Sequence, residues 1–190
     1  MSVSRKVYTR TGDDGTTALL FGGRVAKDAP GPTAYGVVDE AVSALGTARA
    51  LATEPQLAEL LVRLQRELFV VGAELATAPE NRTKLEPEVS IVTAAMVTAL
   101  EPVIDDLTAR YEPPQEFVLP GENPVAAALD VARTVVRRAE REAVGAAAQG
   151  WLDGSEVVAY LNRLADLVYT AARWQEGSYR PVRADPPNKK

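Results

Sequence analysis

The 190-residue sequence contains no cysteine and no histidine. The absence of cysteine excludes disulfides, thiolate metal sites and a thiol nucleophile. The absence of histidine removes the imidazole as general base, metal ligand or pH switch, and this excludes Ser-His and Cys-His catalysis and most zinc chemistry. An enzyme with this sequence has to work with carboxylates, arginines, hydroxyl groups and backbone amides.

The sequence also lacks an overall excess of positive charge, because its net charge is −5. Nonspecific nucleic-acid binding needs a basic surface, so we expect no nucleic-acid partner. Residues 1–27 differ from the rest, with five Lys and Arg side chains against two Asp, a local net charge of +3 that suits a small anion. There is no signal-peptide pattern and no apolar run near the length of a membrane span, so we expect a cytoplasmic protein without membrane association.

With 46% hydrophobic and 25% charged residues, the composition is that of a globular protein, and the length favours one domain. After residue 30, apolar residues recur at spacings of three and four, which is typical of amphipathic helices, and no strand pattern appears up to residue 175. We therefore predict an all-α fold, a bundle of about five helices in a single domain over residues 1–175. Residues 1–30 are predicted to be its irregular N-terminal segment, and residues 176–190 a flexible tail.

Apolar stripes and capping residues predict where the helices begin and end. Asn123-Pro124 should provide the cap and the first turn of the fourth helix, and Ser155 should cap the fifth. Pro102 should kink or split the third helical region. The expected helices lie at about 33–51, from Pro55 to about 75, at 89–110, at 124–147 and at 156–174.

Four arginines gather on the predicted fourth helix. Arg133, Arg137 and Arg141 are spaced at i, i+4 and i+8 and share one face, and Arg138 lies beside them. One interpretation is a solvated basic face; the other is an anion site in which at least one arginine is partly buried and has a carboxylate or phosphate partner. Asp39, near the apolar stripe of the first helix, is a candidate partner for Arg133, unless both side chains are separately solvated.

The opening stretch YTRTGDDGTT, residues 8–17, is rich in turn residues but matches no standard phosphate or calcium loop. It lacks the lysine of a Walker A motif and the spacing of a dinucleotide-binding glycine motif, and Asp13 and Asp14 are adjacent where an EF-hand alternates its acids. Glycines that turn backbone amides toward an anion, threonine hydroxyls, Arg10 and Lys27 favour a phosphate cradle. A capped turn or a solvated loop is the alternative.

Six motifs in order resemble those of the PduO-type ATP:cob(I)alamin adenosyltransferases. They are YTRTGDDGTT, FGGRVAKD, AYGVVDE, FVLPG, ARTVVRRAER and YLNRLADL, and they extend from residue 7 to about 174. The resemblance implies a five-helix bundle that forms a homotrimer with active sites between adjacent subunits. It implies transfer of the 5′-deoxyadenosyl group of ATP to the cobalt of cob(I)alamin with release of triphosphate, and it implies Mg²⁺ as cofactor. A reductase and a cobalamin-dependent acceptor enzyme are candidate partners.

The resemblance also implies roles for individual residues. Arg133, Asp39 and Arg137 match catalytic positions, while Phe117 matches the aromatic residue that covers the lower face of the corrin ring and keeps the lower nitrogen ligand off cobalt. No protein ligand of the metal follows from the resemblance. Expected ATP contacts are Thr9, Arg10, Thr11, Gly12, Gly15, Thr16, Thr17, Lys27, Arg137, Arg138, Glu140, Arg141 and Asn162.

Three positions depart from the family's usual pattern. Asp14 stands where the family usually has lysine, Ala165 where it has serine, and Glu122 where it has a second glycine after FVLPG. These departures bear on ATP affinity rather than on the reaction class. The alternative function is a non-catalytic ATP or cobalamin carrier or chaperone of the same fold, and a third hypothesis is a bundle that serves only as an assembly partner.

Overall fold

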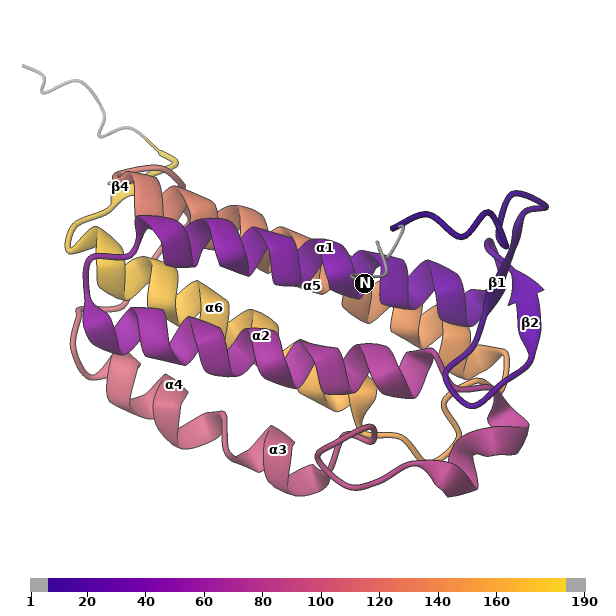
Figure 1. Cartoon of the computed structure of the whole chain (residues 1–190). Coiled ribbons are helices and arrows are strands. Elements are labelled where there is room, and N and C mark those ends of the chain that lie inside the picture. The colour runs from indigo at the N-terminus through magenta and orange to yellow at the C-terminus, as the bar shows by residue number, and fades with distance from the viewer. Residues whose placement is uncertain (1–6, 184–190) are drawn as a thin grey trace, which may run out of the picture.

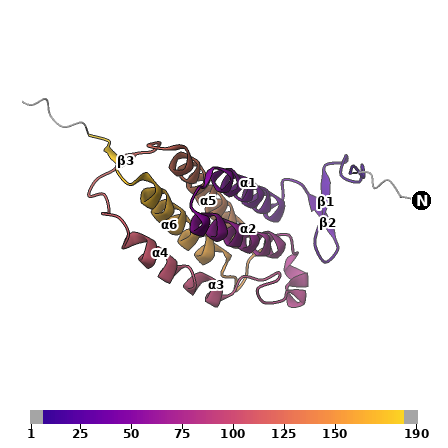
Figure 2. The ribbon, with the colours of Figure 1, turned by 60° about the vertical axis from the view of Figure 1, so that its left-hand side comes forward.

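The computed structural model describes residues 7–183, in which the long helices lie side by side and a β-hairpin extends from one end of the bundle (Figures 1 and 2). The predicted all-α bundle is confirmed, and the expected third helix is divided into α3 and α4. The helices are α1 Pro30–Leu51, α2 Pro55–Leu75, α3 Ala94–Thr98, α4 Glu101–Thr108, α5 Pro124–Ala148 and α6 Val157–Glu176, with a 3₁₀ helix at Pro79–Lys84. The short strands are β1 Thr16–Ala18, β2 Arg24–Ala26, β3 Val118–Leu119 and β4 Arg180–Pro181.

The core lies where α5 packs against α1 and α6, and where α1 packs against α2. Large leucines such as Leu45, Leu64 and Leu68 fill the α1–α2 side. By contrast, α5 buries mainly alanines, and because helix spacing depends on the side chains at the contact, this allows close approach of its neighbours. The buried alanines of α5 are Ala126, Ala132, Ala139, Ala143 and Ala146.

The start of α1 is fixed by its contact with the loop after α5. The helix begins at Pro30, earlier than predicted, because proline is favoured in the first turn of a helix. A Cβ atom at Gly31 would lie 2.3 Å from the Trp151 ring, so only glycine allows this approach. The Trp151 indole Nε1 also donates a hydrogen bond to the Leu75 carbonyl at 2.7 Å, which ties the end of α2 to the same point.

The predicted caps are confirmed for α5 but not for α6. The Asn123 Oδ1 accepts a hydrogen bond from the Ala126 amide at 2.9 Å. The N-cap of α6 is Glu156 rather than Ser155, and it forms no side-chain cap. The Ser155 hydroxyl nevertheless accepts a hydrogen bond from the Val157 amide at 3.1 Å. Ser155, one residue before the N-cap, therefore satisfies one of the free amides at the start of α6.

The prediction that residues 1–30 are irregular is wrong for residues 16–26, which form an antiparallel hairpin with Thr17 opposite Val25. The hairpin is attached to the bundle by the buried Leu19. The Leu20 amide also donates a hydrogen bond to the carbonyl of Ala76, directly after α2, at 2.9 Å.

Two further predictions are wrong at β3 and β4. Val118 pairs with Pro181 and Leu119 with Arg180, so a strand does occur before residue 175 and the segment after residue 176 has regular structure at residues 180–181. Strands of two residues have no readable periodicity, and their partners lie far apart in the sequence. Residues 184–190 of the expected tail lie outside the described residues. None of the helices formed by residues 7–183 combines the length and the apolar character that crossing a membrane requires.

Candidate functional site

The predicted nucleotide segment is brought together around Gly12, Gly15 and Lys27. A Cβ atom at Gly12 would lie 3.3 Å from the Lys27 Nζ, so the ammonium group lies directly beside this glycine. The Lys27 amide donates a hydrogen bond to the Gly15 carbonyl at 2.9 Å. Gly15 has a positive φ of 82°, which side chains rarely adopt, and Arg10 has a φ of 62°. Lys27, which follows β2, therefore lies beside the Gly12–Gly15 turn that precedes β1.

Asp14 and Arg24 hold this loop in shape. The Asp14 Oδ1 accepts hydrogen bonds from the amide of Thr16 at 2.9 Å and from its hydroxyl at 2.8 Å. These bonds, together with the charge of Arg24, lower the pKa of the Asp14 carboxyl below its usual value. The Arg24 Nη2 donates to the Thr11 carbonyl at 2.5 Å and to the Thr16 hydroxyl at 2.6 Å.

Arg24 is a functional candidate that the sequence analysis did not identify. The Gly22-Gly23 pair is a hairpin signal, and a hairpin there places Arg24 opposite Ala18, as the observed register does. Arg24 binds Thr11, and both Arg24 and Asp14 bind Thr16, so they fix two of the expected ATP contacts.

The four arginines of α5 lie mostly in solvent. Arg133 is partly buried, while Arg137, Arg138 and Arg141 are exposed. Arg138 pairs with Glu40 of α1, and the Arg141 Nη1 donates to the Arg137 carbonyl at 3.0 Å. Among the ion pairs of residues 7–183, Arg137 and Arg141 take part in none. Two cationic groups on one face are thus directed to solvent, as an anion site requires.

The predicted pair between Asp39 and Arg133 does not form within the chain. Consecutive helical residues point about 100° apart, so Glu40 faces α5 while the exposed Asp39 faces the groove between α1 and α2. The Arg133 Nε instead donates to the Asp130 Oδ1 at 3.2 Å, within α5. Asp39 is exposed, although it lies next to the buried Val38 of the apolar stripe, as expected.

Asn162 and Glu140, two of the expected ATP contacts, are brought together from different helices. The Asn162 Nδ2 on α6 donates to the Glu140 Oε1 on α5 at 2.9 Å. Glu140 follows Arg137 by three residues, so the pair lies next to the exposed arginine face. The α5 and α6 contributions to the predicted site are therefore adjacent.

Phe117 stands in the loop before β3 and is 87% exposed. It borders a cavity of about 260 Å³ together with Glu116, Val182 and Arg183. The loop lies at the end of the bundle opposite the β1–β2 hairpin (Figures 1 and 2). A single chain therefore does not bring Phe117 and the predicted nucleotide segment together.

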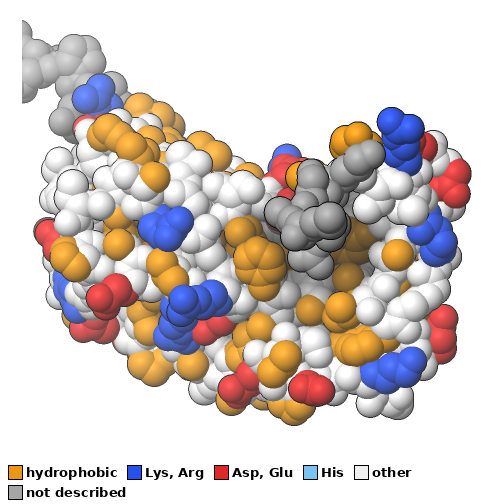
Figure 3. Space-filling model, in the orientation of Figure 1, with side chains coloured by type: hydrophobic (Ala, Val, Ile, Leu, Met, Phe, Trp, Pro, Cys, Tyr) orange, Lys and Arg blue, Asp and Glu red, His pale blue; other side chains and the backbone are white. Residues whose placement is uncertain are grey.

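A groove of about 430 Å³ runs between α1 and α2 and is bordered by Tyr35, Asp39, Val42 and Phe69. The Phe69 side chain is exposed. Hydrophobic side chains lie at the surface across the face that α1 and α2 form (Figure 3). Part of the α1–α2 face is therefore both apolar and exposed.

Comparison with known proteins places this arrangement in a family. The family model described as cobalamin adenosyltransferase matches residues 7–175. The chain belongs to the cobalamin adenosyltransferase family.

Two curated members of the family illustrate the similarity. A corrinoid adenosyltransferase from Citrobacter freundii is 42% identical over 171 residues, covering 90% of this chain and 95% of the relative. The corrinoid adenosyltransferase PduO of the same organism is 40% identical over 170 residues, covering 90% of this chain and 50% of PduO.

Among solved structures, a variant PduO-type ATP:corrinoid adenosyltransferase from Lactobacillus reuteri, complexed with cobalamin and ATP, has a TM-score of 0.83 at 30% identity. The match covers 94% of this chain and all of that chain.

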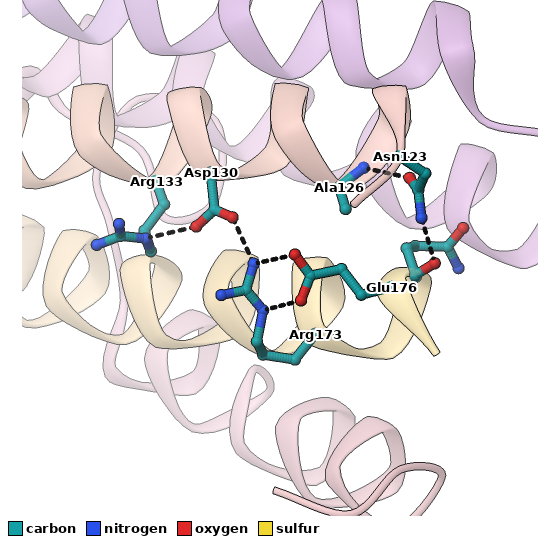
Figure 4. Close-up of polar contacts among 7 residues, drawn as sticks. Asn123, Ala126, Asp130, Arg133, Arg173 and Glu176 are labelled. Carbon is teal, nitrogen blue, oxygen red and sulfur yellow. Dashed lines mark hydrogen bonds and ion pairs between the residues drawn. The ribbon is translucent and has the colours of Figure 1, made fainter. Parts of the chain in front are cut away.

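The chain described by residues 7–183 also contains a buried polar network that the sequence analysis missed. Asp130 of α5 contacts Arg173 of α6, and Arg173 also contacts Glu176 (Figure 4). Burial raises the pKa of the Glu176 carboxyl, although the charge of Arg173 acts in the opposite direction. The sequence does contain a signal for this network. Helix α6 is apolar around most of its circumference, so a charged side chain near its end, such as Arg173, needs partners of opposite charge.

No protein ligand for a metal was predicted, and residues 7–183 contain no group of three or more carboxylates placed to hold a metal ion.

Proposed function

We propose that this protein transfers the 5′-deoxyadenosyl group of ATP to the cobalt of cob(I)alamin, forming adenosylcobalamin and releasing triphosphate. The observation that carries the proposal is the exposed arginine face of α5 beside the Asn162–Glu140 pair, in a member of the cobalamin adenosyltransferase family. The similar structure solved with both cobalamin and ATP supports it.

The chemistry explains how the reaction proceeds without histidine. Cobalt(I) is itself a strong nucleophile, so the protein does not have to deprotonate one. A Co–C5′ bond forms as the C5′–O bond breaks, and the electron pair of the broken bond leaves with the triphosphate. Arg133, Arg137 and Arg141 stabilise this developing charge, and Arg138 and the Glu140–Asn162 pair position the nucleotide.

The N-terminal segment binds ATP through its cationic and hydroxyl side chains. Lys27 beside Gly12 supplies a positive charge. The amides of Gly15 and Thr16 already donate to the Gly12 carbonyl and the Asp14 carboxylate, so they shape the loop rather than bind the phosphates. The other expected contacts in this segment are Thr9, Arg10, Thr11, Thr16 and Thr17.

The exposed Phe117 ring provides an apolar cover for the lower face of the corrin. An apolar group there disfavours the lower nitrogen ligand on cobalt, which makes reduction to cobalt(I) easier.

Mg²⁺ fits such a site, since it is usually held by substrate phosphates with one or two carboxylates rather than by a protein cage. Glu140 is the carboxylate on α5 next to the arginine face that would serve as such a ligand. When bound, Mg²⁺ neutralises part of the triphosphate charge.

A homotrimer with sites between subunits accounts for the separation of the two ends of the chain. The 22 residues of α1 span roughly 33 Å, so one subunit cannot bring its own hairpin and its own Phe117 to one ATP–corrin pair. The apolar α1–α2 face is suited to an interface, where Asp39 would meet Arg133 of a neighbouring subunit. Light scattering should give a trimer mass, and Phe69→Asp should lower it; a monomeric wild type would contradict the proposal.

The decisive assay mixes the protein with ATP, Mg²⁺ and chemically reduced cobalamin and follows the visible spectrum. We expect adenosylcobalamin to accumulate. ATP and cobalamin binding without turnover, while a known enzyme works in parallel, would instead favour the carrier; no ATP binding would favour an assembly role. A reductase and a cobalamin-dependent acceptor enzyme are the expected partners, and the cytoplasmic location stays a prediction that cell fractionation tests.

A further inference from the structure

A buried carboxylate, Asp130, connects the partly exposed Arg133 to the interior of the bundle. Asp130 is 4% exposed, and its two oxygens have different partners. Oδ1 accepts from the Arg133 Nε at 3.2 Å, and Oδ2 accepts from the Arg173 Nη2. Figure 4 shows the three side chains in a row from α5 to α6. One carboxylate thus holds two arginines.

The inner end of this row is fixed more firmly than the outer end. Arg173 is 4% exposed, and its Nη2 donates to the Glu176 Oε1 at 2.9 Å. Its Nε lies 2.9 Å from the Glu176 Oε2, and the Glu176 side chain is 1% exposed. Because Arg173 pairs with two carboxylates in the interior, its guanidinium is restrained, and it restrains the orientation of Asp130 in turn.

The same region is tied to the loop that carries Phe117. Asn123, which follows this loop directly, donates from its Nδ2 to the Gln175 carbonyl at 2.7 Å. Arg180 pairs with Glu122 at 3.3 Å. The end of α6, which contains Arg173 and Glu176, is therefore also joined to the segment directly before α5.

Stability alone does not account for these buried charges. Replacing a buried ion network by apolar side chains of similar volume is often neutral or stabilising. Apolar side chains, however, cannot orient a guanidinium. Asp130 binds Arg133 through Nε, and Figure 4 shows the two terminal nitrogens of Arg133 pointing away from Asp130. These terminal groups are the pair that recognises phosphate oxygens in a bidentate manner.

We propose that Asp130, held by Arg173 and Glu176, is a positioning residue that directs the terminal nitrogens of Arg133 toward the reacting triphosphate. This role rests on the proposed adenosyl transfer. It identifies a partner for Arg133 inside its own subunit, independent of Asp39.

The test is Asp130→Asn in the full-length protein, which keeps the side-chain size and removes the charge. Loss of a charge-assisted hydrogen bond should lower kcat about tenfold and change KM for ATP less. In an Arg133→Ala background the same substitution should leave the remaining kcat unchanged, because its effect passes through Arg133. Equal fold-losses in both backgrounds would overturn the positioning role, and so would wild-type kcat in Asp130→Asn.

Glu74→Gln is the matched control for loss of a buried carboxylate. Glu74 is fully buried on α2, pairs with Arg82 at 2.8 Å and accepts from the Val92 amide at 2.7 Å, so it has a comparable set of partners away from Arg133. It should lower the melting temperature without a tenfold loss of kcat. A loss of kcat as large as that of Asp130→Asn would overturn the proposal.

If Asp130→Asn does not fold, Glu176→Gln perturbs Arg173 from its other side and should lower kcat about twofold to threefold; wild-type kcat there would overturn the role. An inactive wild-type protein would show that the proposed function itself fails, before any variant is compared.

Discussion

The α5–α6 half of the proposed site stands on helices of the core, whereas the N-terminal half stands on a hairpin outside it. Arg133 and Glu140 are carried by a helix with a row of buried alanines, and a buried ion network holds one of them. The hairpin and the turn before it depend on backbone pairing and on exposed hydrogen bonds that Asp14 accepts and Arg24 donates. Exposed bonds of this kind compete with water, so each adds little to stability.

This difference predicts different roles for the two halves of the site. Groups that must be fixed in the transition state stand on the rigid half, because preorganised donors cost no rearrangement during the reaction. Groups that close around ATP stand on the half that local bonds can reshape. We therefore expect substitutions on α5 to affect kcat and substitutions in the hairpin to affect KM for ATP.

The largest effect is expected for Arg133→Ala. Loss of one preorganised donor raises the barrier by about 3 kcal/mol, so kcat should fall on the order of a hundredfold while ATP affinity changes less. Steady-state kinetics and calorimetry with ATP measure the two. Arg163→Ala is the control, because Arg163 is a half-exposed, ion-paired arginine on α6 away from this face. Wild-type-like kinetics in Arg133→Ala would remove this residue from the mechanism.

Phe117→Ala tests the part of the proposed site that faces the corrin ring. Because the ring is almost fully exposed, its removal should leave the melting temperature nearly unchanged. Conversion of cobalt(II) substrate with a reductant should fall about tenfold more than conversion of pre-reduced cobalt(I), a difference of ~1.4 kcal/mol. If both substrates lose activity equally, Phe117 does not act by keeping the lower ligand off cobalt.

Arg24→Met tests the hairpin half. The substitution removes the bonds to the Thr11 carbonyl and the Thr16 hydroxyl. A net loss of about 1 kcal/mol corresponds to roughly a fivefold rise in KM for ATP, with kcat nearly unchanged. Arg24→Lys should recover part of the affinity. A fall in kcat with unchanged KM would break the proposed division between the two halves.

The smallest effect concerns Asp14 and pH. Because the pKa of this carboxyl is lowered in the folded protein, its contribution to hairpin stability is fully present above its usual value of 3.8 and is lost as pH falls through the lowered value. As the pH is raised from acidic values to 5, the Thr16 amide should therefore become better protected from hydrogen exchange. This gain should exceed the change expected from the pH dependence of the intrinsic exchange rate. Asp14→Asn should abolish this step; its persistence would assign it to another group.

Local chemistry predicted those parts of the fold that depend on neighbours in the sequence. Asn123-Pro124 starts α5 as expected, because a cap and a first-turn proline need only the following residues. Pro102 lies in the first turn of α4, next to the predicted division. Periodicity also identified the shared face of Arg133, Arg137 and Arg141.

Features that depend on packing between distant segments could not be predicted in this way. The choice between Asp39 and Glu40 as partner for α5 depends on how α1 is rotated about its axis. The buried network depends on α5 meeting α6, and no local pattern in the sequence distinguishes Asp130. The pairing of residues 118–119 with residues 180–181 joins segments on either side of two helices.

The Val182 amide donates a hydrogen bond to the Phe117 carbonyl at 2.8 Å, next to the β3–β4 pairing. During synthesis the ribosome releases residue 117 well before residue 182. The loop that carries Phe117 therefore reaches its paired form only after α5 and α6 have been made and have folded back. In each newly made chain the corrin-facing end therefore folds late, after the hairpin at the other end has been able to close.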